Sequence, residues 1–267
     1  MAAMLGTIQA IWRYPVKSLC GEQVPTAAVT ASGLVGDRAY ALRDRATGRV
    51  MSGKRWARLF ECTASYPDGP SAPPTITLPD GSRVGVDAAA AEMLSAWLGR
   101  DVELVRALPD HSAEFEIAIQ TVEDIEAGVD QSAIEAGDYP CPPGTFFDAA
   151  PLHLLTDATL AALGAAYPEG RFDVRRFRPN VLIATGGAAG LVEEGWSGRT
   201  VALGDEVQAS VLMGTIRCVM TTLPQADLPR DPKILRTVAQ RAGGNVGVYA
   251  TVVTEGLLRA GDRVELR

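Results

Sequence analysis

The sequence predicts a mainly β fold that is rich in β-barrel structure and has only a few α-helices. Short apolar runs that favour strands recur along the chain, and turns containing Gly and Pro separate them. Only three segments carry the spacing and end signals of helices. Of the 267 residues, 47% are hydrophobic and 21% are charged, which allows a sizeable globular core. Many short strands joined by Gly-rich turns are typical of barrels.

The first half of the chain is expected to contain short strands and one helix. The predicted strands cover 6–12, 24–30, 38–43 and 49–52, and a hairpin is expected over 75–86. The helix is expected over 87–98, where Met93, Leu94 and Trp97 recur at helical spacing after an Asp cap. Gly99 is expected to end it.

The second half is expected to contain two helices and further strands. One helix is predicted over 157–166, with Thr156 as its N-cap. The other is predicted over 232–241, because Pro232 suits a first turn and Gly243-Gly244 a stop. The predicted strands cover 181–185, 200–203, 207–213, 246–253 and 263–266.

An acidic segment rich in Pro and Gly separates the two halves. Six acidic residues lie between 114 and 130, and Pro140-Cys141-Pro142-Pro143-Gly144 follows. Such blocks are typical of a solvated surface loop or linker. The sequence therefore predicts a β-barrel domain over 1–110, an acidic linker or loop over 111–150 and a second β domain over 151–267.

Charge and cysteine spacing exclude several classes of protein. The net charge of -7 disfavours a nucleic-acid partner, because clustered Lys and Arg hold phosphate backbones. No secretory signal is present, and no apolar run approaches the roughly 18 residues that span a bilayer. We therefore expect a cytoplasmic protein with no membrane partner. The four cysteines form no Cys-x-x-Cys pair, so neither a zinc ribbon nor a plant-type iron–sulfur domain is predicted.

The first candidate cluster lies at predicted strand ends. Lys17-Ser18 follows the opening strand, and Arg38 begins another. Lysine, serine and arginine side chains can hold a phosphate by charge and hydrogen bonds. A solvated surface is the alternative, because most Lys and Arg side chains are exposed.

The second candidate cluster leads into the predicted strand 181–185. Arg175, Arg176, Arg178 and Asn180 lie here in an acidic protein. The arginines could form surface salt bridges with Glu193-Glu194 or the acidic block. They could also hold an anionic ligand, with Asn180 donating to and accepting from a heterocycle edge.

The third candidate is Cys218, which follows Arg217 just beyond the strand 207–213. A cationic neighbour favours the thiolate, which is the form that attacks or binds metal. The other three cysteines are expected to be small buried hydrophobes. The chain has two histidines, and His153 lies in an apolar run that suggests a core residue, so a Cys–His nucleophile is poorly supplied.

Together these clusters resemble the MOSC family. The resemblance lies in Ile11-Trp12-Arg13-Tyr14-Pro15-Val16-Lys17-Ser18, Gly36-Asp37-Arg38, Leu155-Thr156-Asp157-Ala158-Thr159, Phe177-Arg178-Pro179-Asn180-Val181, Arg217-Cys218-Val219-Met220-Thr221-Thr222, Gly247-Val248-Tyr249 and Gly261-Asp262. Each motif is short, but their joint order and spacing are specific and cover nearly the whole chain.

The resemblance implies an N-terminal β-barrel domain of MOSC type, a MOSC β-barrel over 151–267 and a bound molybdenum cofactor (molybdopterin). Cys218 matches the cysteine that binds the metal. Lys17, Ser18 and Arg38 look like contacts to the cofactor phosphate. The residues that match the lining of the pterin and metal site are Thr156, Asp157, Arg178, Asn180, Arg217 and Tyr249.

The resemblance further implies a molybdenum-dependent oxidoreductase that reduces N-hydroxylated small molecules by N–O cleavage, with electrons from a separate donor protein. Two alternatives remain: a sulfur carrier or transferase with a persulfide on Cys218, and a module that stores or presents the cofactor. One departure concerns Leu223-Pro224-Gln225, where relatives continue with Val-Asp-Pro. The acidic residue is therefore missing or displaced to Asp227, which affects the expected substrate specificity.

Overall fold

The computed structural model describes residues 3–118, 120–131 and 136–267. Parts of the predicted N-terminal domain and of the predicted acidic linker, at 1–2, 119 and 132–135, lie outside this description.

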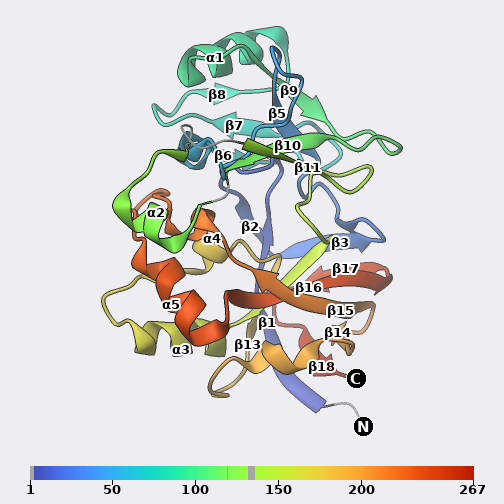
Figure 1. Ribbon diagram of the computed structural model, residues 1–267. Coiled ribbons are helices and arrows are strands. Elements are labelled where there is room, and N and C mark those ends of the chain that lie inside the picture. Colours follow the sequence, from blue (N-terminus) through green and yellow to red (C-terminus); the bar gives the residue numbers. More distant parts are fainter. Residues whose placement is uncertain (1–2, 119, 132–135) are drawn as a thin grey trace.

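Seven strands close a β-barrel in the lower part of the molecule in Figure 1. Their order is β13 (Val181–Ala184), β12 (Leu152–Thr156), β16 (Asn245–Thr254), β15 (Val207–Ile216), β14 (Thr200–Leu203), β18 (Arg263–Leu266) and β1 (Ala3–Arg13), and β1 pairs back with β13. Strand β2 (Glu22–Val24) extends the sheet beside β1. All these pairings are antiparallel except that of β12 with β13. The predicted mainly β fold is confirmed.

The barrel interior is filled by the inward side chains of these strands. In β1, Ile8 and Ile11 are buried against Val181 and Ile183 of β13. In β15, Val207, Ala209 and Val211 alternate with more exposed residues, as a half-buried strand requires. Strand β12 was not among the predicted strands, because its five residues are all buried and show no alternation.

Helices cover one side of the barrel. They are α3 (Asp157–Ala166), α4 (Val174–Phe177) and α5 (Lys233–Ala242), with the 3-10 helices η3 (Val192–Trp196) and η4 (Val219–Thr222) nearby. Leu163 of α3 and Val238 of α5 pack in one apolar cluster with Phe177. The predicted start of α3 is confirmed, because the Thr156 side chain accepts a hydrogen bond from the Thr159 amide.

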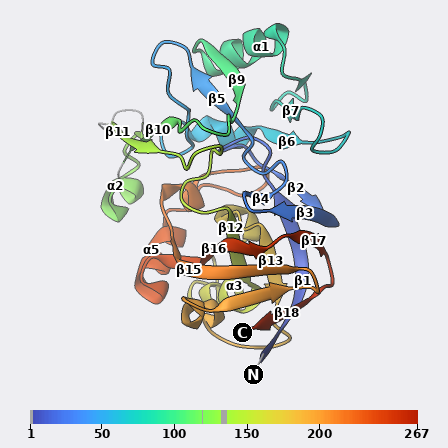
Figure 2. The same ribbon diagram turned by 90° about the vertical axis from the view of Figure 1, so that its right-hand side faces the viewer.

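The upper part of the molecule is built from the first half of the chain (Figures 1 and 2). Its elements are β5 (Tyr40–Asp44), the 3-10 helix η1 (Ala57–Glu61), β6 (Thr63–Ser65), β7 (Thr75–Thr77), β8 (Arg83–Val84), α1 (Ala88–Leu98) and β9 (Val102–Arg106). Strands β3 (Thr26–Thr30) and β4 (Gly33–Leu34) lie lower, and their buried side chains pack in the barrel core. Helix α1 has the predicted Asp87 cap and ends at Gly99, which is left-handed with φ of 68°. The predicted strand 49–52 is wrong, because only Val50 forms isolated bridges there.

The two halves of the chain are not separate in space. Strand β1 belongs to the barrel formed by the second half, and β3 pairs with β17 (Gly256–Arg259) near the C-terminus. The predicted boundaries at 110 and 150 therefore divide the sequence but not the hydrogen-bonded sheets.

The predicted acidic linker is more ordered than a solvated loop. It contains β10 (Glu114–Ala118), which pairs with β11 (Ala136–Pro140), and the short helix α2 (Val122–Ala127). Phe115, Cys141 and Phe146 are buried in one cluster with Ala41 and Val50. The expectation of a surface excursion was wrong for these residues, because apolar side chains alternate with the glutamates and cover the upper core.

Within the described ranges, no helix is both long and apolar enough to cross a lipid bilayer.

Gly247 gives a stability prediction. It has φ of 77°, and a Cβ there would lie 2.3 Å from His153 Nε2 and 2.6 Å from the Leu154 carbonyl oxygen. We expect Gly247→Ala to lower the free energy of unfolding by about 3 kcal/mol, from backbone strain and overpacking together.

Gly243→Ala is the control, because Gly243 has φ of 55° with open space around its Cβ position. We expect this control to lower the free energy of unfolding by about 1 kcal/mol, from backbone strain alone. Urea unfolding measures both, and equal losses would contradict the steric argument.

Candidate cofactor and metal site

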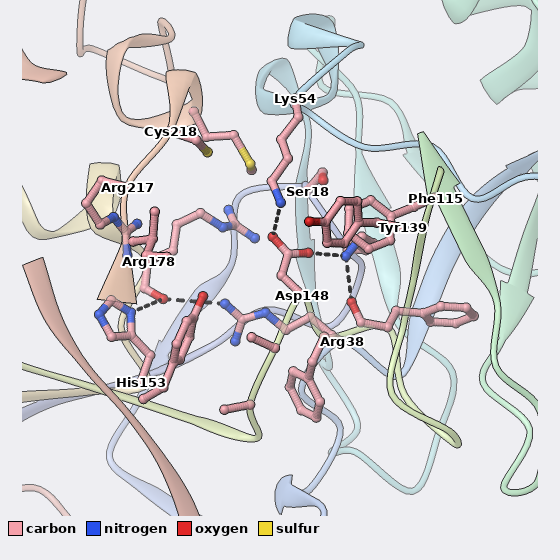
Figure 3. A pocket seen from close by; sticks show the side chains of 18 of the residues that line it. Ser18, Arg38, Lys54, Phe115, Tyr139, Asp148, His153, Arg178, Arg217 and Cys218 are labelled. Carbon is pink, nitrogen blue, oxygen red and sulfur yellow. Dashed lines mark hydrogen bonds and ion pairs between the residues drawn. The ribbon is translucent and has the colours of Figure 1, made fainter. Parts of the chain in front are cut away.

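One cavity of about 330 Å³ lies where the barrel, the upper part and the β10–β11 hairpin meet (Figure 3). Eight of the ten predicted site residues line it: Lys17, Ser18, Arg38, Arg178, Asn180, Arg217, Cys218 and Tyr249. Further lining residues include Lys54, Phe115, Tyr139, Asp148 and His153. The sequence-derived clusters, which are far apart along the chain, therefore meet at one cavity.

The other two predicted residues lie elsewhere. The Thr156 hydroxyl donates to Glu193 Oε2 at 2.6 Å, and Asp157 accepts from the Thr185 amide at 2.9 Å. Neither lines the cavity, because β12 runs away from it after His153 and both residues begin helix α3. In this structure the two residues cap and anchor helix α3, and their contact with the pterin and metal site stays a prediction.

Three residues at the site have left-handed backbone conformations that side chains rarely adopt. The φ angles of Ser18, Arg38 and Arg178 are 65°, 46° and 55°. Such conformations cost about 1 to 2 kcal/mol each outside glycine, and they persist where the surrounding contacts determine them. Their occurrence at one cavity indicates a site whose backbone is shaped for binding.

The buried carboxylate of Asp37 joins the segments that carry these residues. Its Oδ1 accepts from the Tyr14 amide at 2.7 Å, and its Oδ2 accepts from Asn180 Nδ2 at 3.0 Å. The same carboxylate forms an ion pair with Arg38. Asn180 is therefore fixed by Asp37 on one side, and its Oδ1 accepts from the His153 amide at 3.1 Å on the other.

Two guanidinium groups contact the Tyr14 ring. The central carbons of Arg38 and Arg178 lie 4.5 and 4.2 Å from the ring centroid. Arg178 also donates to the Leu19 carbonyl oxygen at 2.7 Å. Burial and the nearby Arg38 charge lower the pKa of Arg178, but a guanidinium stays charged at physiological pH. Tyr14 thus contacts two cations, of which Arg178 is buried and Arg38 is partly buried.

Two lysines share one carboxylate in the cavity. Lys54 Nζ lies 2.8 Å from Asp148 Oδ2, and Lys17 forms an ion pair with Asp148 Oδ1. Lys17 also donates to the Phe146 carbonyl oxygen at 2.8 Å. Figure 3 shows the Lys54 ammonium directed at the Asp148 carboxylate. Sequence reasoning missed Lys54 and Asp148, although lysine is rare in this chain and could have marked Lys54.

The charges of this group shift two pKa values in opposite directions. Burial alone would raise the pKa of Asp148, but the adjacent Lys17 and Lys54 charges outweigh it and hold that pKa well below its usual range. Burial would lower the pKa of Lys54, but Asp148, followed by Cys218, raises it above its ordinary value. Asp148 and Lys54 are therefore both charged at neutral pH.

Cys218 sits between the end of β15 and the 3-10 helix η4, in the N-cap position of that helix. Its neighbour Arg217 donates to the Phe177 carbonyl oxygen at 2.8 Å. Arg217 Nε is buried and has no hydrogen-bond partner among the described residues. One donor next to Cys218 is thus left for a ligand.

The three clustered arginines have three different roles. Arg175 lies near the surface and forms salt bridges, but with Asp173 and Asp227 rather than with the expected Glu193-Glu194 or acidic block. Arg176 is fully buried and donates to the carbonyl oxygens of Thr221 at 3.1 Å, Leu223 at 3.3 Å and Pro229 at 2.7 Å. It thereby fixes the backbone that follows Cys218. Only Arg178 of the three lines the cavity.

The structure also shows where Asp227 lies, the residue to which the missing acidic position could have been displaced. Asp227 pairs with Arg171 and Arg175 and does not line the cavity, so it does not replace the missing acidic residue. Among the described lining residues, Asp148 is the one carboxylate.

His153 lines the cavity wall from the core of the barrel. Burial and the Arg217 charge lower the pKa of His153 well below its ordinary value, so it is neutral. Its two ring nitrogens lie 3.4 and 3.3 Å from the carbonyl oxygens of Arg178 and Val246. Its ring centroid is 5.7 Å from that of Tyr249. This agrees with the prediction of a core residue rather than a base.

Comparison with known proteins identifies the class to which the chain belongs. Residues 142–265 match the MOSC domain and residues 5–106 match the MOSC N-terminal beta barrel domain. The two matches cover most of the chain, which therefore belongs to the family of MOSC proteins that carry this N-terminal domain.

The particular relatives are distant. The chain is 25% identical to the mitochondrial amidoxime reducing component 2 of Macaca fascicularis, over 97% of this chain and 83% of that protein. It is also 25% identical to the mitochondrial amidoxime-reducing component 1 of Mus musculus, over 98% of this chain and 82% of that protein. The crystal structure of the YUAD protein from Bacillus subtilis has a similar fold, with a TM-score of 0.50 and 10% identity over 100% of this chain and 96% of that chain.

The residues at the cavity suit the cofactor associated with the MOSC family. Five cationic side chains, Lys17, Arg38, Lys54, Arg178 and Arg217, and one carboxylate line the cavity of a chain whose net charge is -7. Guanidinium and ammonium groups favour a phosphate, and a cysteine thiolate is a soft metal ligand. Both Nδ2 hydrogens of Asn180 are used by Asp37 and the Trp12 carbonyl oxygen, so a heterocycle would donate to Asn180 Oδ1, which accepts one bond within the protein. The donor set therefore fits an anionic molybdopterin with one cysteine ligand to the metal.

Asp148 gives a prediction about stability and pH. Replacing it by Asn leaves two ammonium groups close together without a counter-charge. We expect Asp148→Asn to lower the free energy of unfolding by about 2 kcal/mol at pH 7, an amount reduced for the partial exposure of the carboxylate.

The pH dependence follows from the lowered pKa of Asp148. The ionised carboxylate stabilises the fold at pH values above its unfolded-state pKa of about 4. This stabilisation is lost as the pH falls toward the lower pKa of the folded state. The difference between wild type and variant, measured by urea unfolding, should therefore shrink below about pH 4. Asp138→Asn, which removes an exposed partner of Arg49, is the control and should cost under about 1 kcal/mol. A pH-independent loss at Asp148 would argue against the ion-pair explanation.

Proposed function

We propose that this cavity binds a molybdenum cofactor with Cys218 as the protein ligand of the metal, and that the protein reduces N-hydroxylated small molecules by N–O cleavage. The observation that carries the proposal is the meeting of Cys218 with five cations and Asn180 at one cavity. The amidoxime-reducing components among the distant relatives support the reaction class at the level of the family.

Different residues of the cavity would contact different parts of the cofactor. Ser18 and Arg38 would contact the phosphate, because both line the cavity and can donate hydrogen bonds to an anion. Arg178 and Asn180 would contact the pterin, since Asp37 and Tyr14 hold them in place. Cys218 would bind the metal, and Arg217 would stabilise negative charge on the ligand sphere.

When bound, the cofactor would supply the two-electron chemistry of N–O cleavage. The overall reaction consumes two electrons and two protons and yields an amine or amidine and water. Aromatic and aliphatic side chains at the outer part of the cavity, such as Tyr139, Met213 and Ile216, would contact the body of the substrate. The electrons would come from a separate donor protein, and a cytoplasmic location belongs to the same proposal.

Loss of Cys218 provides the direct test of the metal-ligand role. In protein made by a host that synthesises the cofactor, we expect Cys218→Ala to lower the molybdenum content at least tenfold and to abolish reduction of a simple amidoxime by a chemical reductant. Cys20→Ala is the matched control, because Cys20 is partly buried nearby but does not line the cavity. Metal analysis and product chromatography measure the two effects. Equal molybdenum in both variants would refute the ligand assignment.

The same preparation separates the two alternatives. A sulfur carrier should show a persulfide-sized mass addition on Cys218 after incubation with a cysteine desulfurase and cysteine. A storage module should retain the cofactor but fail to reduce the amidoxime. Either result would replace the reductase proposal.

Arg38 tests the phosphate end independently of the metal. We expect Arg38→Met to reduce the cofactor bound per protein about tenfold or more, because a charged hydrogen bond to phosphate of roughly 1.5 to 3 kcal/mol is lost. Arg43→Met is the matched control, since Arg43 forms a surface ion pair with Glu103. Fluorescence of the oxidised, released pterin measures the bound cofactor. Full retention by Arg38→Met would place the phosphate elsewhere.

A further inference from the structure

The distribution of lysine in this chain is uneven. Of the 25 basic residues apart from histidine, only Lys17, Lys54 and Lys233 are lysines, and the rest are arginines. Two of these three lysines line the cavity and share the Asp148 carboxylate. One ammonium group balances the single negative charge of Asp148. The positive charge of the second lysine is therefore left to interact with a ligand.

The two cavity lysines differ in how many of their ammonium N–H groups contact other protein groups. The Lys17 ammonium contacts Asp148 and the Phe146 carbonyl oxygen, and it lies 4.0 Å from the centroid of the Phe115 ring. Its side chain is only 4% exposed. All three of its N–H groups are therefore directed at protein groups, and Lys17 has no spare donor for a ligand.

Lys54 is less fully used. Within the described ranges its ammonium makes one ion pair, with Asp148, and lies 5.0 Å from the Phe115 ring centroid. Its side chain is 18% exposed, and it lines the open cavity. An ammonium group has three donors, so a ligand could accept hydrogen bonds from Lys54 without breaking its bond to Asp148.

Lys54 and Cys218 line the same cavity. Both side chains enter it from the upper part of the view in Figure 3, and the Lys54 ammonium is paired there with Asp148. The turn that carries Lys54 is fixed, because the Gly53 amide donates to Ser18 Oγ at 2.9 Å and a Cβ at Gly53 would lie 2.7 Å from the Phe60 ring. Close to the same thiol, the buried Arg217 Nε lacks a partner among the residues described.

We propose that Lys54 is an anion-contacting residue on the Cys218 side of the cavity, and that Lys17, the residue predicted from the sequence for contact with phosphate, instead holds Asp148 in place. The ligand is a small anion, or the anionic group of a larger ligand, that approaches the thiol. Asp148 positions Lys54 and is itself positioned by Lys17.

This inference can be tested on the full chain produced without the cofactor, so its failure would leave the proposed function untouched. Iodoacetate and iodoacetamide both alkylate a thiolate with loss of iodide, but iodoacetate is an anion and iodoacetamide is neutral. The ratio of their rates at Cys218, at one pH, reports the charge that an approaching anion meets, because thiolate fraction and access affect both rates. Mass spectrometry of the Cys218 peptide measures each rate.

We expect Lys54→Met to lower the iodoacetate-to-iodoacetamide ratio about fivefold to tenfold at low salt, and added salt to reduce the difference. Lys54→Arg, which keeps the charge, should restore most of the ratio. Lys233→Met is the matched control, because Lys233 is exposed at the start of α5 and does not line the cavity; it should leave the ratio unchanged.

Two outcomes would overturn the proposal. One is a ratio within twofold of wild type in Lys54→Met; the other is a lowered ratio that Lys54→Arg fails to restore, which would indicate a purely structural role. Lys54→Gln serves as a second neutral variant, and unfolding midpoints for all variants show whether a folding defect affects the comparison.

Discussion

The site depends on one buried carboxylate, that of Asp37. It accepts hydrogen bonds from the Tyr14 amide and the Asn180 side chain and pairs with Arg38, so three segments far apart in the sequence meet on its two oxygens. A buried carboxylate is stable only where such partners satisfy it. The geometry of the cations around Tyr14 and the orientation of Asn180 follow from this constraint. The part of the cavity around Asp37 is therefore held by buried contacts of the core.

The electrostatics of the cavity oppose those of the whole chain. The net charge is -7, yet five cations and one carboxylate line the cavity. Holding so many like charges together costs free energy. Hydrogen bonds from Arg178 to the Leu19 carbonyl oxygen and from Arg217 to the Phe177 carbonyl oxygen, and the contacts of Arg38 with the Tyr14 ring, offset part of that cost. An anionic ligand would relieve the repulsion that these contacts leave, and this favours its binding.

Much of the fold could be predicted from the sequence, because strand alternation and helix end signals are local. Helix α3 with its Thr156 cap and strands β14 and β18 lie where those signals place them. Strand β12 could not be recognised by alternation, since both of its faces are buried. The hairpin of β10 and β11 was obscured by its glutamates, although Phe115 and Ile117 alternate with them and Phe115 is buried.

The candidate site could be predicted only in part, for a similar reason. Sequence motifs indicate which residues lie near the cavity, but they do not predict which partner each side chain contacts. In this structure Thr156 and Asp157 cap and anchor helix α3, and Lys54 and Asp148 depend on an ion pair between segments that no local pattern connects. Arg175, Arg176 and Arg178 are close in sequence, yet one lies near the surface, one holds carbonyl oxygens and one reaches the cavity.

Strand β1 has a consequence for how the chain can be divided. Although it is the first strand of the chain, its residues pair with β18 and with β13, so it closes the barrel that the second half forms. A fragment that begins at the MOSC match would leave both of these strands with a free edge. Unpaired strand edges invite pairing with other chains. The two sequence domains of this protein therefore share one barrel, which the second half does not close without β1.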